Sequence, residues 1–278
     1  MKKLGLIAGG GALPVQLAAH CESSGRPFFV LRLKGFAGPE LADYPGAEAG
    51  IAELGRGFKL LRGAACESVC FAGTVSRPDF AALRPDMRGL MALPGVILAA
   101  RAGDDGLLRF MLKEFEKEGF HVEGAHEVMG GLTLPIGPLG RHGPQARDQG
   151  DILRAMQVAR VIGREDIGQA AVVCAGLVLA VEAQEGTDAM LERVARLPQA
   201  LRGSPEAPRG VLAKAPKPHQ ETRVDLPTIG LHTLKQCSSA GLAGIAGEAG
   251  RVLVMDREAV VGLADELGLF VVGVDPEA

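Results

Sequence analysis

The pattern of apolar and polar residues in the first part of the chain alternates between strand and helix. Short apolar runs predict buried parallel strands at residues 4–8, 27–33 and 67–73. Between the first two runs, the apolar residues from Leu13 to Cys21 have helical spacing, with Pro14 in the first turn, where proline is tolerated. A further helix is predicted from about Gly106 to Lys117, with its apolar residues on one face. This alternation predicts a Rossmann-like α/β domain over residues 1–130.

A segment rich in glycine and proline then interrupts the pattern. Residues 131–150 carry few helix signals and are predicted to form a linker or an irregular cover loop. Helical spacing returns at 151–162, and later apolar runs predict strands at 169–174, 177–182, 210–213, 244–246, 251–255 and 270–274. The turn Ala175–Gly176 predicts a hairpin. Helices are predicted at 189–196, 231–239 and from the capping residue Asp256 to 267. The sequence thus predicts a second, mixed α/β domain over residues 151–278, which carries the catalytic loop described below.

Composition narrows the class of protein. The chain has 278 residues, of which 47% are hydrophobic and 23% charged, as expected for a soluble globular protein with room for two domains. Its formal net charge of −3 argues against non-specific nucleic-acid binding. The 5 cysteines form no CxxC pair, so neither a disulfide framework nor a thiolate zinc site is indicated, and a reduced cytoplasmic compartment is expected. The apolar run Leu4–Ala8 is too short for a signal peptide, and no transmembrane helix is expected.

The glycine turn at residues 9–11 is the first candidate binding site. A glycine-rich turn between a strand and a helix lets backbone N–H groups approach a phosphate, which makes Gly10, Gly11 and Ala12 candidate ligands. The dinucleotide fingerprint is incomplete, because Pro14 occupies the third glycine position and no acid ends the second strand. Arg32 and Lys34 lie there instead, which disfavours NAD but leaves NADP open. The alternative is a tight turn without a ligand.

Other candidates lie where predicted strands end and helices begin. Thr74 and Arg77 follow the third strand, at the edge of an open α/β sheet where ligands bind. Asp104 and Asp105 begin a helix, where they either cap it or bind a ligand or metal. In the second half, Gly186, Thr187 and Asp188 follow a strand; the last two are candidate caps, and the turn is also a candidate anion site.

The stretch from Gly210 to Gly230 is the most informative one. A strand-like run ends in Lys214 and Lys217, and prolines stiffen a loop that contains His219, Arg223 and Asp225. Preorganised charge suits phosphoryl transfer, because the basic side chains can neutralise phosphates and Asp225 can hold a divalent metal or activate a water. The alternative is a solvated basic turn.

Five sequence blocks resemble one family. They are AGGGALP (8–14), AGTVSRP (72–78), GDDGLLR (103–109), EAQEGTDAML (182–191) and KAPKPHQETRVDLPTIG (214–230), and the last two are the specific ones. Over essentially its full length the chain resembles the LpxI-type UDP-2,3-diacylglucosamine pyrophosphatases. One departure is Glu221, where aspartate is commoner in that family.

The resemblance implies a two-domain α/β enzyme with its active site between the domains. It implies hydrolysis of the pyrophosphate to UMP and 2,3-diacylglucosamine 1-phosphate in lipid A biosynthesis, with a divalent cation, normally Mg²⁺. In that family, water is thought to attack the phosphorus nearer the sugar. The expected partners are the UDP-diacylglucosamine substrate and its lipid product, with peripheral contact at the cytoplasmic face of the inner membrane; a homodimer is left open.

The residues and the resemblance together give a set of predicted site residues. Asp225, Lys214 and Lys217 are the predicted catalytic residues, and Asp225 is also the predicted metal ligand. The predicted substrate-binding residues are Gly10, Gly11, Ala12, Thr74, Arg77, Asp104, Asp105, Gln169, Gly186, Thr187, Asp188, His219 and Arg223. The helix at 107–115 and the segment 130–150 are the predicted apolar walls for acyl chains. The competing functions are an NADP-dependent oxidoreductase using the glycine turn and a nucleotide- or lipid-binding protein without catalysis.

Overall fold

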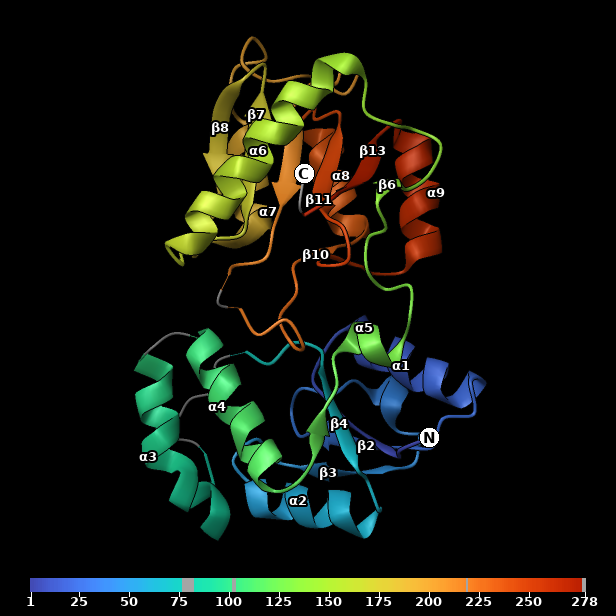
Figure 1. Cartoon of the computed structure of the whole chain (residues 1–278), viewed down its shortest axis with the longest axis vertical. Coiled ribbons are helices and arrows are strands. Elements are labelled where there is room, and N and C mark those ends of the chain that lie inside the picture. The colour runs from blue at the N-terminus through green and yellow to red at the C-terminus, as the bar shows by residue number, and fades with distance from the viewer. Residues whose placement is uncertain (77–82, 102–103, 219, 277–278) are drawn as a thin grey trace. The chain divides into compact units, whose positions relative to one another are not determined.

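The chain forms two compact units in the computed structural model, which describes residues 1–76, 83–101, 104–218 and 220–276 (Figure 1). The first unit comprises Met1–Gly130 together with Arg223–Asp225, and the second comprises Gly131–Thr222 together with Leu226–Ala278. Both units are α/β, which confirms the predicted fold class.

The first unit is built on a 5-stranded parallel sheet. Its strands are β1 (Leu4–Ala8), β2 (Phe28–Leu33), β3 (Gly46–Ala49), β4 (Ser68–Ala72) and β5 (His121–Val122). Their order, β3-β2-β1-β4-β5, is Rossmann-like and reverses direction between β1 and β4. Every residue of β1 is buried, as expected for a central parallel strand covered on both faces.

Helices cover this sheet and complete its core. They are α1 (Ala12–Ser23), α2 (Leu54–Gly63), α3 (Met87–Arg101), α4 (Asp104–Lys117) and the short α5 (Ala125–Val128), with a 3₁₀ turn at Pro39–Leu41. Phe58 of α2 meets Phe115 of α4 edge to face, with ring centroids 4.8 Å apart. Leu112 is buried in the same cluster. Leu112 and Phe115 are therefore core, whereas Leu107 and Leu108 of the same face are only partly buried. The role of this helix as a wall for acyl chains stays a prediction.

The segment Arg223–Asp225 belongs to the first unit although it comes from the second half of the chain. Val224 packs against the phenylalanine-rich core of that unit. The Nη1 of Arg223 donates to Oε1 of Glu116 at 2.8 Å. A Cβ on Gly124 would lie only 3.3 Å from the Cα of Arg223, so the backbones approach closely there. The predicted catalytic loop is thus divided, because its last part is held by the first unit.

The second unit is built on a 6-stranded mixed sheet of order β6-β13-β11-β9-β7-β8. Its strands are β6 (Gly137–Pro138), β7 (Ala170–Cys174), β8 (Leu177–Val181), β9 (Val211–Lys214), β11 (Gly244–Glu248) and β13 (Phe270–Val274). The strands β9, β11 and β13 are parallel, whereas β7 and β8 form the predicted antiparallel hairpin. A separate parallel pair joins β10 (Thr228–Ile229) to β12 (Leu253–Val254).

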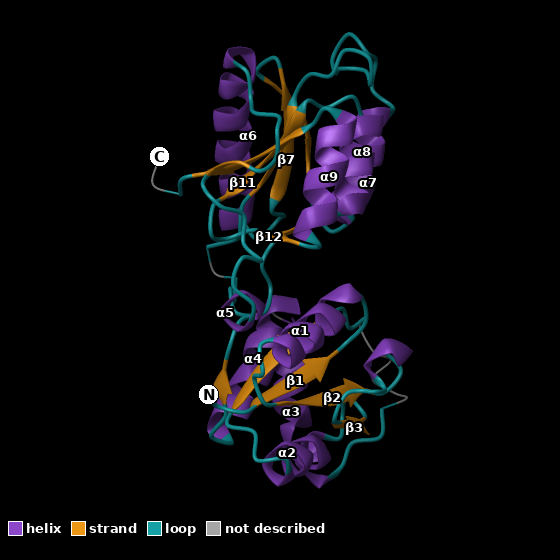
Figure 2. Cartoon of the chain, turned by 90° about the vertical axis from the view of Figure 1, so that its right-hand side faces the viewer, coloured by secondary structure: helices purple, strands orange, loops and turns teal. Residues whose placement is uncertain are grey.

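Helices lie on both faces of this second sheet. The helix α6 (Ala146–Arg164) covers one face, and α7 (Gly186–Ala195), α8 (Leu231–Ser239) and α9 (Arg257–Leu267) cover the other (Figure 2). Successive residues of β9 alternate between these layers: Ala213 packs with the α6 side and Leu212 with the opposite side. Lys214 has the same parity as Leu212 and therefore enters the layer of α7 and α8.

The segment 131–150 is more ordered than the sequence suggests. It contains β6, which pairs with β13, and the first turn of α6, where the N–H of Gln145 donates to Oδ2 of Asp148 at 2.8 Å. Leu134 and Leu139 of this segment are buried in the core of the second unit. These two side chains are thus part of the core, whereas Ile136 of the same segment is exposed. A wall for acyl chains in this segment stays a prediction.

Two further observations concern helix length and the cysteines. Among the described residues, no helix is both long and apolar enough to cross a bilayer. The cysteines Cys21, Cys66, Cys70, Cys174 and Cys237 are free and buried.

Candidate functional site

The glycine turn of the first unit lies where β1 and β4 end. The N–H of Gly10 donates to the carbonyl of Thr74 at 2.9 Å, and the N–H of Thr74 donates to the carbonyl of Gly10 at 2.8 Å. A Cβ on Gly9 would lie 2.7 Å from the carbonyl oxygen of Thr74, so a side chain does not fit there. The turn is thus fixed against the end of β4, and the predicted residues Gly10 and Thr74 lie together.

This turn leads directly into α1 at the point where the strand order reverses, which is where open α/β sheets bind ligands. Gly11 precedes the helix with φ of 90°, a conformation that favours glycine. The structure describes all residues of the first turn of α1. This turn contains no acid, and no side chain caps it. Gly11 and Ala12 are exposed. Backbone N–H groups and the helix dipole therefore favour an anion at this position.

The neighbouring arginine argues against a 2′-phosphate site for NADP. The Nη1 of Arg32 donates to the carbonyl of Leu41 at 3.0 Å and to that of Tyr44 at 3.3 Å. Its guanidinium is thereby engaged in holding the turn that follows β2. The second predicted cation, Lys34, is exposed, and the described structure shows no contact of this kind for its side chain.

Lys214 is the most unusual charged residue of the second unit. It ends β9, is 5% exposed, and its Nζ donates to the carbonyl of Thr228 at 2.9 Å. Burial lowers the pKa of Lys214, because the ammonium loses its hydration, and the nearby Glu182 opposes this shift. A buried cation in this state gains more from a bound anion than an exposed lysine would, because water screens it less.

Glu182 follows β8 and is also buried. Its Oε1 accepts the hydroxyl of Thr187 at 2.9 Å, and its Oε2 accepts the N–H of Gln169 at 3.2 Å. Thr187 therefore does not cap α7, since its hydroxyl points to Glu182 instead. The same carboxylate brings two predicted residues, Gln169 and Thr187, close to Lys214.

Glu182 is a functional candidate that the sequence did not reveal. A single acid after a predicted strand forms no motif with other residues that sequence reasoning could recognise. Glu182 does, however, begin the family-specific block 182–191. Asp188, in the first turn of α7, lies with Oδ2 3.5 Å from Nε2 of His232. Both side chains of that contact are mostly exposed. The side chain of Asp188 does not cap α7. The N-cap residue of that helix is Glu185, and no side-chain hydrogen bond caps the helix.

Lys217 is held in a different way from Lys214. Its Nζ lies 2.7 Å from Oδ1 of Asp166, and its N–H donates to Oε1 of Gln220 at 3.0 Å. The side-chain amide of Gln220 also reaches Oε1 of Gln169, at 3.4 Å. The carbonyl of Gln169 in turn accepts the N–H of Ala215 at 3.0 Å. These contacts fix the loop after β9 onto the start of β7.

Each of the remaining predicted residues is placed by its own unit or lies outside the described residues. Arg223 is paired with Glu116, and Asp225 is half-buried on the first unit. Asp104 and Asp105 lie in the first turn of α4. Arg77 and His219 fall outside the described residues. Among the residues that the structure describes, no group of three or more His, Cys, Asp or Glu side chains could hold a metal ion.

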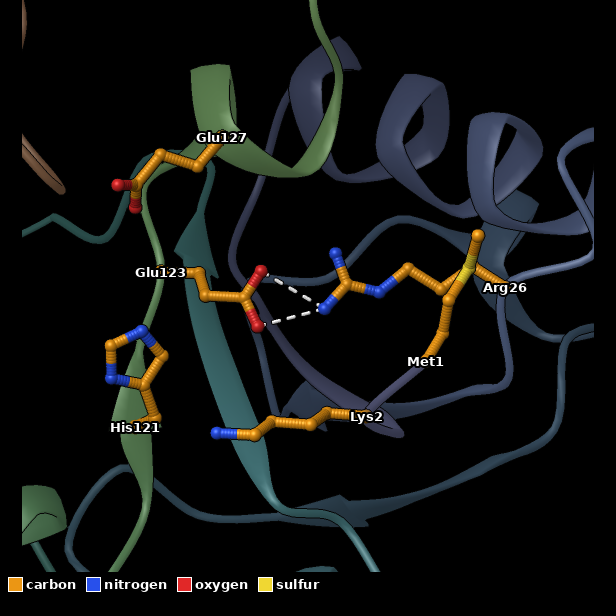
Figure 3. A pocket seen from close by; sticks show the side chains of 6 residues that line it. All are labelled: Met1, Lys2, Arg26, His121, Glu123 and Glu127. Atoms are coloured by element: carbon orange, nitrogen blue, oxygen red, sulfur yellow. Dashed lines mark hydrogen bonds and ion pairs between the residues drawn. The ribbon is translucent and has the colours of Figure 1, made fainter.

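A separate pocket lies at the opposite edge of the first sheet. It has a volume of about 390 Å³ and is lined by Met1, Lys2, Arg26, His121, Glu123 and Glu127 (Figure 3). Arg26 and Glu123 point toward each other across it, 2.7 Å apart. Met1 and Lys2 precede β1, Arg26 precedes β2 and His121 begins β5, whereas Glu123 and Glu127 follow that short strand. Most of the lining thus lies where strands begin, and ligands of such sheets bind where the strands end. The pocket is therefore not the candidate site.

Comparison with known proteins assigns the chain to a family. The model of the LpxI N-terminal domain matches residues 3–132, and that of the LpxI C-terminal domain matches residues 135–272. A protein of Caulobacter vibrioides named UDP-2,3-diacylglucosamine pyrophosphatase LpxI is 68% identical over 277 residues, which cover 100% of this chain and 99% of that protein. The glycine turn at the end of β1 and the buried lysine at the end of β9 thus belong to a member of the LpxI family.

Proposed function

We propose that this protein hydrolyses the pyrophosphate bond of UDP-2,3-diacylglucosamine, giving UMP and 2,3-diacylglucosamine 1-phosphate in lipid A biosynthesis. The observation that carries the proposal is the 68% identity, over the whole chain, to a protein named for that activity. The matches to both LpxI domains support it. The charges and turns of the two units suit a pyrophosphate substrate, as the following roles explain.

The glycine turn of the first unit takes the nucleotide phosphate in this proposal. The N–H groups of Gly11 and Ala12 lie at the uncapped N-terminus of α1, where the helix dipole attracts an anion. Thr74 lies beside this turn and offers a hydroxyl group. Substrate contacts of Arg77 and His219 remain predictions, because both lie outside the described residues.

Lys214 stabilises the charge that develops on the pyrophosphate. Its ammonium is buried beside Glu182, so water screens it weakly and its position is fixed. In the reaction, the oxygen of a water bonds to the phosphorus nearer the sugar and the bond from that phosphorus to the bridging oxygen breaks. UMP leaves with the bridging oxygen, and Asp225 accepts the proton of the attacking water. Gln169, Gly186, Thr187 and Asp188 would contact the same substrate from the region around Lys214.

A divalent cation fits Asp225 only with help from the substrate. The described residues offer no cluster of three or more candidate ligands, so a preformed cage is not provided there. Mg²⁺ is commonly bound by one or two carboxylates together with phosphate oxygens and water, which suits a single aspartate and a pyrophosphate. When bound, the ion would neutralise phosphate charge. Asp225 would hold it, and Lys214 would add a second positive charge.

The decisive experiment replaces Asp225 by alanine. We expect kcat to fall by about 10³-fold or more, which corresponds to about 4 kcal/mol, while binding of UDP-diacylglucosamine is retained. The measurement is UMP release with Mg²⁺, repeated with EDTA, alongside calorimetric titration of the substrate. Asp43→Ala is the matched control, because Asp43 is an exposed acid of the first unit, lies outside the predicted site residues and should lose far less. A near-normal kcat in Asp225→Ala would remove this residue from the mechanism.

The same assays separate the competing functions. A wild-type protein that binds the substrate but releases no UMP with any divalent cation is a binding protein without catalysis. Tight binding of NADP would restore the oxidoreductase hypothesis, which the engagement of Arg32 with Leu41 and Tyr44 disfavours.

A further inference from the structure

The helix α3 carries a continuous stripe of exposed apolar side chains. Met87, Leu90, Met91, Ile97 and Leu98 are 78%, 54%, 73%, 47% and 70% exposed, and Pro94 between them is also exposed. These positions follow helical spacing and so lie along one face. The stripe spans about 17 Å at 1.5 Å per residue. Soluble proteins usually scatter such residues singly, and a contiguous set marks an interaction surface.

The opposite side of α3 fixes the direction in which this stripe faces. A Cβ on Gly95 would lie 2.5 Å from the ring of Phe110 of α4, and a Cβ on Gly89 would lie 2.0 Å from the carbonyl oxygen of Ala52. Ala92 is buried in the core of the first unit. In Figure 1, α3 lies outside α4, on the side away from the strands. The stripe therefore faces outward because close packing holds the other face.

Basic side chains lie on the exposed surfaces of the two helices that pack against α3, which are α2 and α4. On α2, Arg56 and Lys59 are exposed, and the helix sequence LGRGFKLLRG contains no acid. On α4, Lys113 and Lys117 are exposed, and Lys117 is paired with Glu114. The exposed acid Glu116 of the same helix accepts from Nη1 of Arg223 at 2.8 Å.

The carboxylates described near α3 are engaged in contacts of their own. Oε2 of Glu114 lies 2.6 Å from Arg88, and Oε1 of Glu114 lies 2.6 Å from Lys117. Glu118 pairs with Arg62 and Arg88. Asp86 accepts the N–H of Gly89 at 2.8 Å, as a cap of α3. These ion pairs neutralise Lys117, Arg62 and Arg88 as well. The positive charge beside α3 therefore comes from Arg56, Lys59 and Lys113.

We propose that the exposed stripe of α3, with the basic side chains of α2 and α4, binds the surface of an anionic phospholipid bilayer. Apolar side chains enter the boundary between headgroups and acyl chains, while lysine and arginine attract the anionic headgroups. A helix that lies in the interface needs no membrane span, which agrees with the described helices. The proposed function gives a reason for this contact, because the substrate is a lipid, but vesicle binding itself does not rest on that function.

Charge favours a bilayer over a second copy of the chain as the occupant. A second copy would bring the same exposed stripe and the same basic side chains of α2 and α4, and like charges would meet at its rim. An anionic bilayer complements both the apolar stripe and the basic flanks. Self-association is therefore the outcome that the test must separate from membrane binding.

The test is flotation of the full-length protein with vesicles of phosphatidylglycerol and phosphatidylethanolamine, compared with vesicles of phosphatidylcholine alone. We expect the wild type to float with the anionic vesicles and to lose this binding at high salt. The triple variant Leu90→Gln, Met91→Gln, Leu98→Gln should bind at least tenfold more weakly. The matched control changes three exposed apolar residues of the second unit: Ile136→Gln, Leu153→Gln, Leu177→Gln. The control should float like the wild type.

Further variants separate the two parts of the proposed surface and guard against misfolding. Lys59→Glu with Lys113→Glu should weaken binding to anionic vesicles without changing the stripe. The single variant Leu98→Gln, together with thermal unfolding curves of all variants, shows whether lost binding reflects lost folding. Equal flotation of the α3 variant and the wild type would overturn the proposal, as would equal losses in the α3 variant and its control. A wild type that self-associates without binding vesicles, and whose α3 variant is monomeric in sedimentation velocity, would also overturn it.

Activity measurements distinguish this proposal from the proposed function. On substrate embedded in anionic vesicles, the α3 triple variant should lose at least tenfold in kcat/KM, whereas on substrate dispersed in detergent micelles it should match the wild type. Absence of hydrolysis by the wild type in both forms would overturn the proposed function and leave vesicle flotation as an independent result.

Discussion

The two units each contain a strand, a glycine turn and a helix, yet the two turns differ in charge. In the first unit, the turn at Gly9–Gly11 leads into α1 through backbone groups, and the first turn of that helix has no acid. In the second unit, the turn after β8 contains Glu185 at the N-cap and Asp188 in the first turn of α7, with the buried Glu182 beside them. The same pattern thus gives one turn that attracts anions and another whose acids oppose them.

This difference assigns distinct roles to backbone and side chain. In the first unit the anion-binding potential comes from N–H groups and requires glycine, because a Cβ at Gly9 would meet the carbonyl of Thr74 at 2.7 Å. In the second unit the positive charge must come from a side chain, and Lys214 supplies it next to Glu182. Four measurements can break or sharpen this distinction.

The largest effect is expected from Lys214→Met. The change keeps much of the apolar stem but removes the charge, leaving Glu182 and Asp188 to repel the pyrophosphate. We expect kcat/KM to fall by about 10³-fold, or about 4 kcal/mol. Steady-state UMP release measures the fall in kcat/KM. Because the variant leaves the buried Glu182 without its cation, a thermal unfolding curve checks that the protein is still folded. Loss of less than tenfold in a folded variant would contradict the role of Lys214.

The second effect is a decline of kcat/KM at alkaline pH. Burial lowers the pKa of Lys214 below its ordinary range, so the free enzyme should lose the required positive charge at lower pH than an exposed lysine would. A bound anion favours the charged form, so the decline of kcat should lie at higher pH than that of kcat/KM. Beyond its pKa, each pH unit should cost about tenfold. A kcat/KM that stays level through the ordinary lysine range would exclude Lys214 as the required cation.

The third measurement compares Gly11→Ala with Gly186→Ala. Both glycines have positive φ, 90° and 79°, and a Cβ at either position meets nothing within 4 Å. Each alanine should therefore lower the free energy of unfolding by about 1–3 kcal/mol, and by a similar amount at both positions, through backbone strain. Gly11→Ala should raise KM by about tenfold, because that turn presents N–H groups to the nucleotide phosphate. Gly186→Ala should raise KM less, because the acids of its turn oppose an anion. Denaturant unfolding and kinetics of the two variants test this, and equal rises in KM would remove the distinction between the turns.

The smallest effect is expected from Lys217→Met. Lys217 is engaged with Asp166, whose side chain is mostly exposed, so the pair contributes at most about 1 kcal/mol. We expect kcat/KM to fall less than tenfold, far less than in Lys214→Met. Asp166→Asn serves as the control, since it frees the lysine without removing its charge. A loss in Lys217→Met as large as that in Lys214→Met, with Asp166→Asn unchanged, would show that Lys217 itself acts on the substrate.

Secondary structure was predictable wherever apolar residues had a clear period. The predicted strands at residues 4–8 and 270–274 and the helix at 231–239 agree with β1, β13 and α8. The helix α3 was missed because its residues are apolar on the exposed face as well as the buried one, so the helical contrast is weak. The helix α2 was missed although it has an apolar face, because Gly55 and Gly57 interrupt its helix signal.

The candidate site was only partly predictable. Lys214 and the glycine turn stand out in the sequence because a lysine that ends an apolar run and three consecutive glycines are local signals. The role of Glu182 was not predictable, since its contacts with Thr187 and Gln169 depend on how β7 and β8 pair. The attachment of Val224 to the first unit was not predictable either, because it is a contact between residues far apart in the chain.

The placement of Val224 has a consequence for synthesis of the protein. A chain that has emerged from the ribosome as far as Gly130 contains the strands and helices of the first unit but lacks the residue that packs against its phenylalanine cluster. About another hundred residues must be made first, which takes roughly 5–20 s at ordinary rates of synthesis. The first unit therefore reaches its final packing only after most of the second has been translated, and separately expressed halves would leave its core incomplete.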